Sequence, residues 1–422
     1  MASRTFLLSV ILFGLFICGL LTKSGQILSF MVLFSVYLFA GIFFRPDKVR
    51  LAVSREISDD RVLHGTPVTI HLEIINQGSS LEEVFLEEAG ATRYTLLEGA
   101  SSLITSLEPG EKLIWEYTLK ADRGFYLLTG LRGEIRDHFG LMSRSVSLEA
   151  PGRFMALPIA YKLRRIKIRP RKTKIYSGFI PARSGGRGVE FFGVRGHQPS
   201  DPPRLINWKA SARHHGSMFT NEFEQERVAD VGLILDAREM SYQGPEQRSL
   251  FESAVSAAAT LADACLNDGN RVGLFIYGRA INWTFPGYGR LQKERIMLSL
   301  ANAVLGEHQV FDKLENLPIS FFPALSQLIY ISPLQKDDLP TLFLLRSRGY
   351  QVLVISPDML DLEKTMKDDP DFKIGWRLAY LERNLMLQRL KQAGVNVLNW
   401  RIDIPVNQII DAFSSPRRPW QQ

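Results

Sequence analysis

Hydrophobic residues are concentrated in two stretches at the start of the chain. Phe6 to Leu21 is apolar apart from Ser9, and Ile27 to Phe44 is apolar apart from two serines. Each stretch is close to the roughly 17–25 residues that a helix needs to cross a bilayer. The pattern predicts a transmembrane helical hairpin in residues 1–48, with helices at about 6–22 and 27–44. A cleaved signal peptide is the alternative, but no A-x-A-like cleavage site follows the first stretch.

Basic residues around the hairpin predict its orientation. Arg4 precedes the first stretch, Arg45 and Lys48 follow the second, and the connection holds only Lys23. Because cytoplasmic flanks carry the excess of Lys and Arg, both ends of the hairpin are expected in the cytoplasm. We therefore expect a multi-pass cell membrane protein whose remaining residues are cytoplasmic.

A second pattern, with period two, follows the hairpin. The segment from Pro67 to Gly78 places Val68, Ile70, Leu72 and Ile74 alternately with other residues, and turn residues recur about every ten positions. Alternation with regular turns is typical of an antiparallel sandwich. The sequence predicts an all-β, sandwich-like domain over residues 49–160, and its isolated histidines are expected to be surface or sheet residues rather than ligands.

Residues 161–227 are expected to form a basic linker followed by a distinctive segment. Between Tyr161 and Arg187 the chain has ten Lys or Arg and no acid, with Ser-Gly signals typical of turns or mobility. Three interpretations stay open: a solvated linker, a contact with anionic lipid headgroups, or a nucleic-acid patch. The net charge of +7 is mild for 422 residues and does not by itself favour nucleic acid.

After residue 228 the pattern changes to apolar strands alternating with amphipathic helices. This alternation predicts an α/β doubly wound domain with a mostly parallel sheet over residues 228–422. Function in such sheets lies at the carboxyl ends of the strands. Four strands end at Asp236, Tyr277, Ser332 and Ser356. Neither serine stands in a G-x-S-x-G elbow, so the sequence gives little support to a hydrolase.

The segment from Gly188 to Arg213 combines cations, aromatic residues and a Pro-Pro pair. Asp201 before two prolines indicates a helix start, and we expect a helix that continues to Arg213. The following strand alternates phenylalanines with Glu222, Glu224 and Glu226. Like charges on one strand face repel unless they are countered.

Two interpretations of this segment follow. In the structural one, the helix lays a basic face over the acidic strand face while Trp208 anchors in the core. In the functional one, some of the charges engage a partner. No nucleophile–base or acid–base pair is identifiable, so a catalytic role is not expected.

This segment and the strand after it resemble the signature of the domain of unknown function 58 family. The chain departs from the family pattern at His197 and Ser200. The matching positions, which we take as a candidate partner surface or domain joint, are Glu190, Arg195, Asp201, Arg204, Ile206, Trp208, Lys209, Ala212, Arg213, Glu222 and Glu224.

The resemblance implies a membrane-anchored protein with a von Willebrand factor type A (vWA)-like domain. It further implies an adaptor or assembly factor that acts through protein–protein contacts, rather than an enzyme. The partners it implies, besides the lipid bilayer, are a MoxR-type AAA+ ATPase and other vWA or transglutaminase-like membrane proteins. Nucleic acid is not expected as a partner.

One departure bears on metal binding. Metal-binding vWA domains carry Asp-x-Ser-x-Ser after the first strand, whose oxygens hold a divalent cation. Here Asp236 is followed by Arg238 and Met240 at the two Ser positions. A guanidinium is not a ligand and repels a cation. With Asp236 and Ser332 as the remaining candidates at the strand ends, we expect no metal and no cofactor, and an ion pair between Asp236 and Arg238 or another cation.

Overall fold

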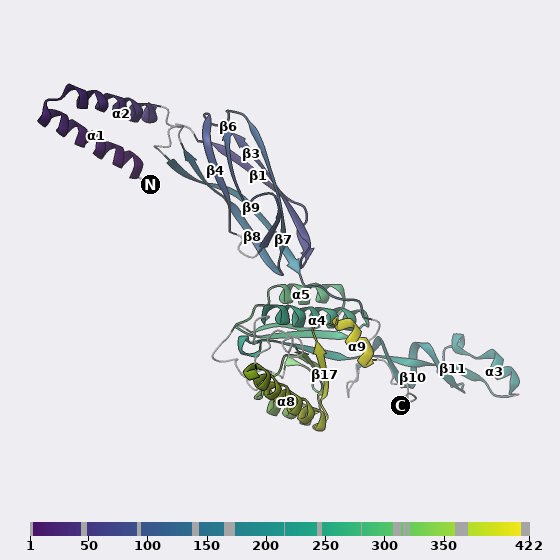
Figure 1. Ribbon diagram of the computed structural model, residues 1–422. Coiled ribbons are helices and arrows are strands. Elements are labelled where there is room, and N and C mark those ends of the chain that lie inside the picture. The colour runs from purple at the N-terminus through teal and green to yellow at the C-terminus, as the bar shows by residue number, and fades with distance from the viewer. Residues whose placement is uncertain are drawn as a thin grey trace. The chain divides into compact units, whose positions relative to one another are not determined.

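The structure is a computed structural model that describes most of the chain. The described residues are 3–43, 49–90, 94–136, 143–163, 174–214, 216–242, 247–279, 281–306, 314, 318, 321–358 and 370–414. The chain divides into two compact units, Met1–Leu157 and Pro158–Gln422. Each is described separately (Figure 1).

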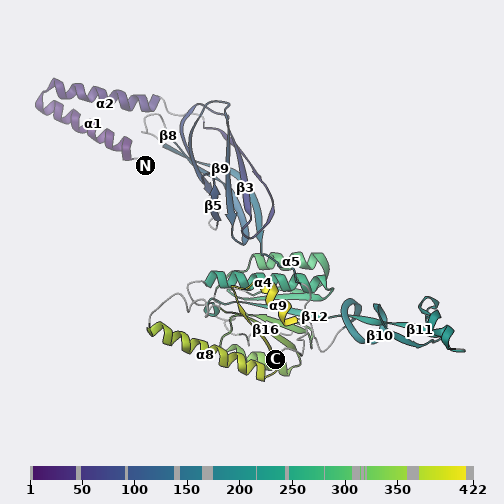
Figure 2. The same ribbon diagram turned by 45° about the vertical axis from the view of Figure 1, so that its right-hand side comes forward.

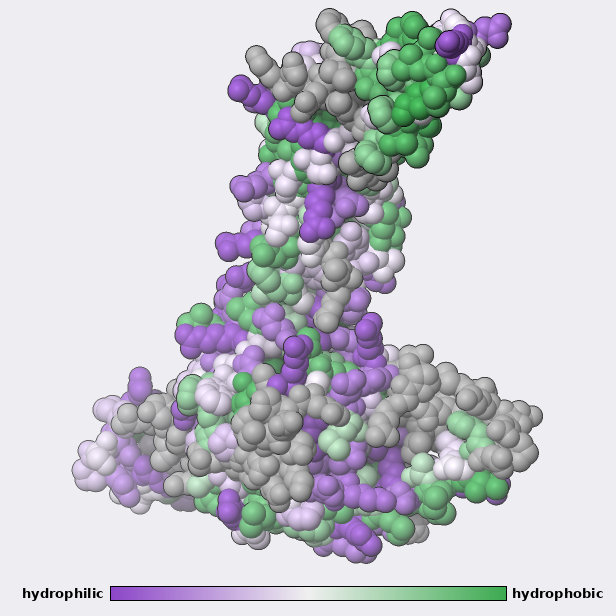
Figure 3. All heavy atoms as spheres, turned by 90° about the vertical axis from the view of Figure 1, so that its left-hand side faces the viewer, coloured by the Kyte–Doolittle hydropathy of each residue, from purple (hydrophilic) through white to green (hydrophobic). Residues whose placement is uncertain are grey.

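The first unit begins with two apolar helices, α1 (Ser3–Thr22) and α2 (Gly25–Phe43), that pack against each other. The contact is close at Gly19, where a Cβ atom would lie 2.8 Å from the Leu28 side chain. Outward-facing side chains such as Leu33 and Phe39 are exposed, and Figure 3 shows hydrophobic side chains crowding over this hairpin. Such exposure of apolar side chains suggests a membrane location.

The apolar helices of the described chain differ in length. In the described residues, the apolar helical segments Phe6–Thr22 and Gly25–Ala40 are shorter than a full span, and Gln247–Asn267 is long and apolar enough to cross a bilayer. That third helix is 67% buried in the second unit, as expected of a core helix. Two bilayer spans and their orientation therefore stay predictions.

The rest of the first unit is rich in β-structure, as predicted. Its described strands form sheets of order β1-β3-β7-β5 and β2-β9-β8-β4-β6, antiparallel except for the β2–β9 pair. The predicted alternation in β3 is confirmed, because Val68, Ile70, Leu72 and Ile74 are fully buried. The two sheets share one hydrophobic core. The strands are β1 (Leu51–Ile57), β2 (Arg61–Leu63), β3 (Pro67–Asn76), β4 (Leu81–Ala89), β5 (Tyr94–Glu98), β6 (Ser102–Leu107), β7 (Lys112–Ala121), β8 (Gly124–Arg136) and β9 (Ser143–Leu157).

The second unit contains a mixed sheet of order β14-β13-β12-β15-β16-β17 in its described part. All neighbouring pairs are parallel except β13–β14, so β14 is an antiparallel edge. The predicted α/β alternation with a mostly parallel sheet is confirmed. The strands are β12 (Asp230–Ala237), β13 (Arg271–Gly278), β14 (Asn282–Gly287), β15 (Gln327–Ile331), β16 (Gln351–Asp358) and β17 (Asn396–Arg401).

Helices cover both faces of this sheet. Figures 1 and 2 show α4 and α5 on one face and α8 on the other. The apolar strand residues are buried because both faces are covered. The helical elements are η2 (Glu239–Ser241), α4 (Gln247–Asn267), α5 (Gly289–Ala301), α6 (Asp338–Ser347), α8 (Pro370–Gln392) and α9 (Val406–Ser414).

Part of the expected linker is a strand. The chain from Lys174 to Gly196 forms β10, which pairs antiparallel with β11 (Phe219–Val228) in a separate two-stranded sheet. The glycines read as turn signals lie at register shifts in this pairing, for example between Ala182 and Gly185. Glycine inside a strand often marks a bulge rather than a turn. Residues 164–173 of the predicted linker lie outside the described residues.

Candidate functional site

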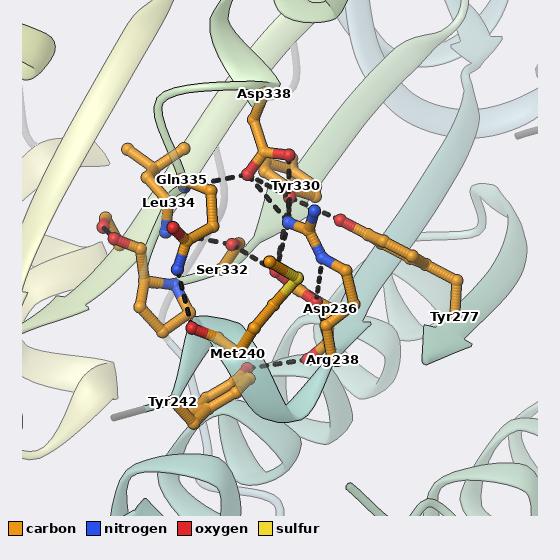
Figure 4. Close-up of polar contacts among 12 residues, drawn as sticks. Asp236, Arg238, Met240, Tyr242, Tyr277, Tyr330, Ser332, Leu334, Gln335 and Asp338 are labelled. Atoms are coloured by element: carbon orange, nitrogen blue, oxygen red, sulfur yellow. Dashed lines mark hydrogen bonds and ion pairs between the residues drawn. The ribbon is translucent and has the colours of Figure 1, made fainter. Parts of the chain in front are cut away.

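Three of the four predicted strand-end residues lie together in the second unit, whereas Ser356 lies inside β16 and bonds to Pro333 and Arg383. Asp236 stands near the end of β12, Tyr277 near the end of the adjacent β13, and Ser332 directly after β15. Two further side chains join them, Tyr330 from β15 and Asp338 from the first residue of α6 (Figure 4). A carboxylate in the first turn of a helix is favoured by the helix dipole. The carboxyl edge of the parallel strands therefore carries a compact polar cluster.

Arg238 bridges the two carboxylates of this cluster. Its Nε and Nη2 atoms donate to Asp236 at 3.0 and 2.8 Å, and Nη2 also donates to both oxygens of Asp338 at 2.9 Å. The Arg238 side chain is 3% exposed and both carboxylates are fully buried. The expected Asp236–Arg238 pair is confirmed. Burying a charge costs free energy unless the charge is paired and hydrogen-bonded, and this bridge offsets the cost of burying the two carboxylates.

Hydroxyl groups add further hydrogen bonds to the same carboxylates. Ser332 donates to Asp236 at 2.7 Å, and Tyr330 donates to Asp338 at 3.0 Å. The Tyr277 and Tyr330 hydroxyls also hydrogen-bond to each other. The guanidinium carbon of Arg238 lies 5.1 Å from the centre of the Tyr277 ring, within cation–π range.

Burial controls the protonation of the cluster. Burial raises the pKa of Asp338 above its usual value, Arg238 opposes that shift, and the nearby Asp236 adds to it. Burial disfavours the charged form of Arg238, yet its pKa is raised because the carboxylate of Asp236 stabilises the cation. The pKa values of Tyr277 and Tyr330 are raised well above 10, mainly by burial. Both hydroxyls therefore stay neutral hydrogen-bond donors at neutral pH.

The residues at this site do not fit a divalent cation. A metal at the strand ends would need the carboxylate oxygens that Arg238 already occupies. The guanidinium offers only donors and carries the same sign of charge as the ion. Among the described residues, no group of three or more His, Cys, Asp or Glu side chains is placed to hold a metal.

The two strand-end serines are engaged in structural hydrogen bonds. Ser332 donates to Asp236 and accepts the backbone N–H of Leu334 at 3.0 Å. Ser356 donates to the carbonyl of Pro333 at 3.2 Å and accepts from Arg383 at 2.9 Å. Both serines are fully buried, and neither hydrogen-bonds to a histidine in the described part of the chain. The geometry shows no activated serine nucleophile.

A second polar cluster holds the end of the β10–β11 hairpin. Arg195 donates to Asp201 through two parallel bonds of 2.8 and 2.7 Å. Asp201 also accepts the backbone N–H of Gln198 at 2.9 Å and the Thr220 hydroxyl at 3.3 Å. The Arg195 guanidinium is the main cause that lowers the pKa of Asp201 to about 2. Bidentate Arg–carboxylate pairs fix geometry as well as charge, so this pair ties β10, the following loop and β11 together.

The expected helix from Asp201 to Arg213 is wrong. A 3₁₀ turn, η1 (Pro203–Leu205), is followed by extended Ile206, and a short helix, α3 (Trp208–Arg213), begins later. Asp201 does not cap a helix because its carboxylate is taken by Arg195. Asn207 caps α3 instead, accepting the backbone N–H of Ala210 at 2.9 Å.

The structural interpretation of this segment is also wrong for Trp208. Its side chain is 66% exposed rather than anchored in a core. Glu222 pairs with Arg195 at 3.6 Å and not with a cation of α3. The positions that stay exposed at this end of the hairpin are Arg204, Trp208, Lys209 and Arg213. The side chains of Glu190 and Glu224 lie outside what the structure describes.

Part of the second unit is similar to a described sequence family. Residues 193–318 match the model of a family described as protein of unknown function DUF58. The uncharacterized protein YeaD of Bacillus subtilis (strain 168) is 26% identical over 168 residues, which cover 40% of this chain and 39% of that protein. The match to this relative therefore spans about two fifths of its length.

Similar solved structures include two small domains. The match to a FixG-related protein from Vibrio parahaemolyticus covers 25% of this chain and 95% of the FixG-related chain, with 18% sequence identity and a TM-score of 0.19. The match to the CARDB domain of the PF1109 protein from Pyrococcus furiosus covers 26% of this chain and 90% of the CARDB chain, with 15% sequence identity and a TM-score of 0.19.

Sequence reasoning missed two members of the buried cluster. Asp338 lies two positions after Lys336 at the start of α6, and Tyr330 lies inside an apolar strand. An acidic residue at the helix start that follows a parallel strand was a usable signal for Asp338. Nothing in the sequence pattern distinguished Tyr330 from a core tyrosine.

We predict that Arg238→Met destabilises the chain. The change leaves two buried carboxylates without their cation, and breaking a buried ion pair costs about 3–5 kcal/mol. Denaturant unfolding of the detergent-solubilised chain at neutral pH measures the loss. The deficit should shrink as the pH falls, because burial raises the pKa of Asp338 and its protonation removes one of the two facing charges. An Arg238→Met variant with wild-type unfolding at neutral pH would contradict the bridge.

We predict that Asp201 titrates near pH 2 in the folded protein. Its pKa is lowered from 3.8 to about 2, so its stabilising effect is present above the unfolded value and is lost as the pH falls through about 2. Carboxyl-carbon NMR of labelled aspartate measures this pKa. Arg195→Met should raise it toward 3.8, whereas Arg204→Met, at an exposed cation of η1, should leave it unchanged. A pKa near 3.8 in the unsubstituted chain would refute the assignment.

Proposed function

We propose that this chain is a membrane-anchored cytoplasmic adaptor or assembly factor that acts through protein–protein contacts. The expected partner is a MoxR-type AAA+ ATPase, together with other vWA or transglutaminase-like membrane proteins. This part of the proposal comes from the resemblance of the signature segment, and the DUF58 match over residues 193–318 supports the resemblance. Two bilayer spans, with both chain ends in the cytoplasm, are part of the same proposal.

The exposed end of the β10–β11 hairpin carries the proposal. Trp208 is 66% exposed and stands among the exposed cations Arg204, Lys209 and Arg213. Tryptophan and arginine are the residue types enriched at the energetic centres of protein interfaces. The Arg195–Asp201 pair holds this end in place. Little backbone conformational entropy would therefore be lost on binding. An exposed aromatic and three cations on a fixed support suit a partner surface with an acidic rim and an apolar pocket.

The second unit supports a vWA-like assignment. A mostly parallel sheet with one antiparallel edge strand and helices on both faces is the architecture expected of such a domain. Arg238 stands where the metal-binding versions carry a serine. We propose that the guanidinium takes the place of the cation and holds the strand-end loops in one arrangement without metal.

We predict that Trp208→Ala lowers partner recovery about 10- to 30-fold, in line with the loss expected when an interface tryptophan is truncated. Affinity purification of the detergent-solubilised full chain from its native cell, with mass spectrometry, measures recovery. Arg204→Ala and Lys209→Ala should each reduce it by a smaller factor. Arg348→Ala, which removes an exposed cation after α6, is the matched control and should change nothing.

Two results would count against the adaptor proposal. One is a chain that is recovered alone, both before and after crosslinking. The other is equal partner recovery with Trp208→Ala, Lys209→Ala and the unsubstituted chain, with all variants retaining the wild-type melting temperature. The second result would leave the hairpin end as a purely structural joint.

The alternative function is a metal-dependent vWA binding module, and magnesium titration tests it. We predict that Mg²⁺ gives no binding heat and no rise in melting temperature with the unsubstituted chain, because Arg238 occupies the carboxylates. Arg238→Ser removes the guanidinium and supplies a hydroxyl beside Asp236, Ser332 and Asp338, so millimolar Mg²⁺ should stabilise that variant. Magnesium stabilisation of the unsubstituted chain would favour the metal-dependent module instead.

A further inference from the structure

Helix α8 has apolar side chains on two opposite faces. The inner face packs into the second unit through Leu387 and Leu390, which belong to the core beside α6 and β16. Arg383 on the same face donates to the carbonyl of Pro333 at 2.9 Å. Residues on this face fix the helix to the sheet. An ordinary surface helix would be polar on its other side.

The outer face of α8 instead carries an aliphatic stripe. Its members follow each other at spacings of four, three and four residues, which places them on one side of the helix, opposite Arg383 and Leu387. Each remains more than half exposed. The members of this stripe are Ile374 (65% exposed), Leu378 (61%), Leu381 (59%) and Leu385 (54%).

We propose that this stripe is the docking surface for an acidic amphipathic helix of a partner protein. The 4-3-4 spacing is that of the seam between two packed helices. The stripe runs from Ile374 to Leu385, and this separation of eleven residue steps corresponds to about 17 Å of helix, or about three turns. An occupant therefore needs apolar residues at the same spacing over about three turns.

The charges beside the stripe define the occupant. By helical position the exposed cations Arg377 and Arg389 lie on the two flanks of the stripe, whereas Lys373 and Lys391 lie farther round the helix. Among the described side chains of α8, the exposed acid Glu382 is bound to Lys336 at 3.1 Å. A partner helix with acidic flanks complements this surface, whereas a second copy of α8 would bring cations against cations.

The distribution of aromatic residues favours a protein helix over a lipid surface. Helices that lie in a membrane interface present a broad apolar face, commonly with Trp or Phe. In α8 the stripe is narrow and purely aliphatic. Trp376 and Tyr380 lie on the other side and stack on each other, with ring centres 5.2 Å apart. This docking surface is separate from the hairpin end and stands whether or not Trp208 binds a partner.

A designed peptide tests the proposal directly. The probe is a fluorescein-labelled helix of four heptads with Leu at positions a and d and Glu at positions e and g. A second peptide carries Lys at e and g. We expect the detergent-solubilised full chain to bind the Glu peptide at least tenfold more tightly than the Lys peptide in fluorescence anisotropy, with weaker binding at 0.5 M salt.

Variants of the stripe provide the decisive comparison. Leu378→Glu with Leu381→Glu should weaken binding of the Glu peptide at least tenfold, and both changes are at exposed positions that should leave the melting temperature unchanged. Ile104→Glu, at a 65% exposed aliphatic residue of the first unit, is the matched control and should bind as the unsubstituted chain does. Equal binding by the stripe variant, equal binding of both peptides, or no binding of either would overturn the proposal.

The other occupants are detected with a probe on the stripe itself. An environment-sensitive dye on Leu385→Cys, in a Cys18→Ser background, reports burial of the stripe. A shift to an apolar environment on transfer from zwitterionic to anionic vesicles without peptide would assign the stripe to lipid and overturn the proposal. Concentration-dependent crosslinking between two chains at position 385 would assign it to self-association, with the same consequence.

Discussion

The arrangement of the strand ends in the second unit depends on one cation placed between two buried carboxylates. Without Arg238, Asp236 and Asp338 would be two like charges buried at the carboxyl edge of the parallel strands. With it, the loop after β12 is bound to the start of α6, because the guanidinium reaches both. Ser332 and Tyr330 add neutral hydrogen bonds to the same oxygens. A loop cross-linked in this way is held in one arrangement.

Much of this architecture was predictable because the sequence pattern reports burial. The alternation in Val68 to Ile74 predicted a sheet with one buried face, and the continuous apolar run before Asp236 predicted a strand covered on both faces. The Asp236–Arg238 pair was predictable for a local reason. Asp236 stands near the end of β12 and Arg238 directly follows that strand. A guanidinium at a position that normally supplies a ligand oxygen excludes the metal and needs an anion.

The parts that escaped prediction depend on contacts between distant segments. Asp338 joins Asp236 from 102 positions away in the sequence, and only the parallel pairing of β12 with β15 brings them together. Asp201 looked like a helix cap because local pattern cannot show that Arg195 takes its carboxylate. The glycine-rich stretch of β10 looked mobile, because its pairing with β11 is interrupted by register shifts that have no local signature.

The same ion pairs decide which charges can serve a partner. Arg195 and Arg204 looked equivalent in the sequence. In the structure Arg195 forms ion pairs with Asp201 and Glu222, whereas Arg204 is exposed. A variant of Arg195 would therefore disturb the support of the hairpin end, and only variants of exposed residues report on binding itself. The binding surface that we propose is therefore smaller than the signature segment. It comprises Trp208 and the exposed cations around it, and the Arg195–Asp201 pair holds their support in place.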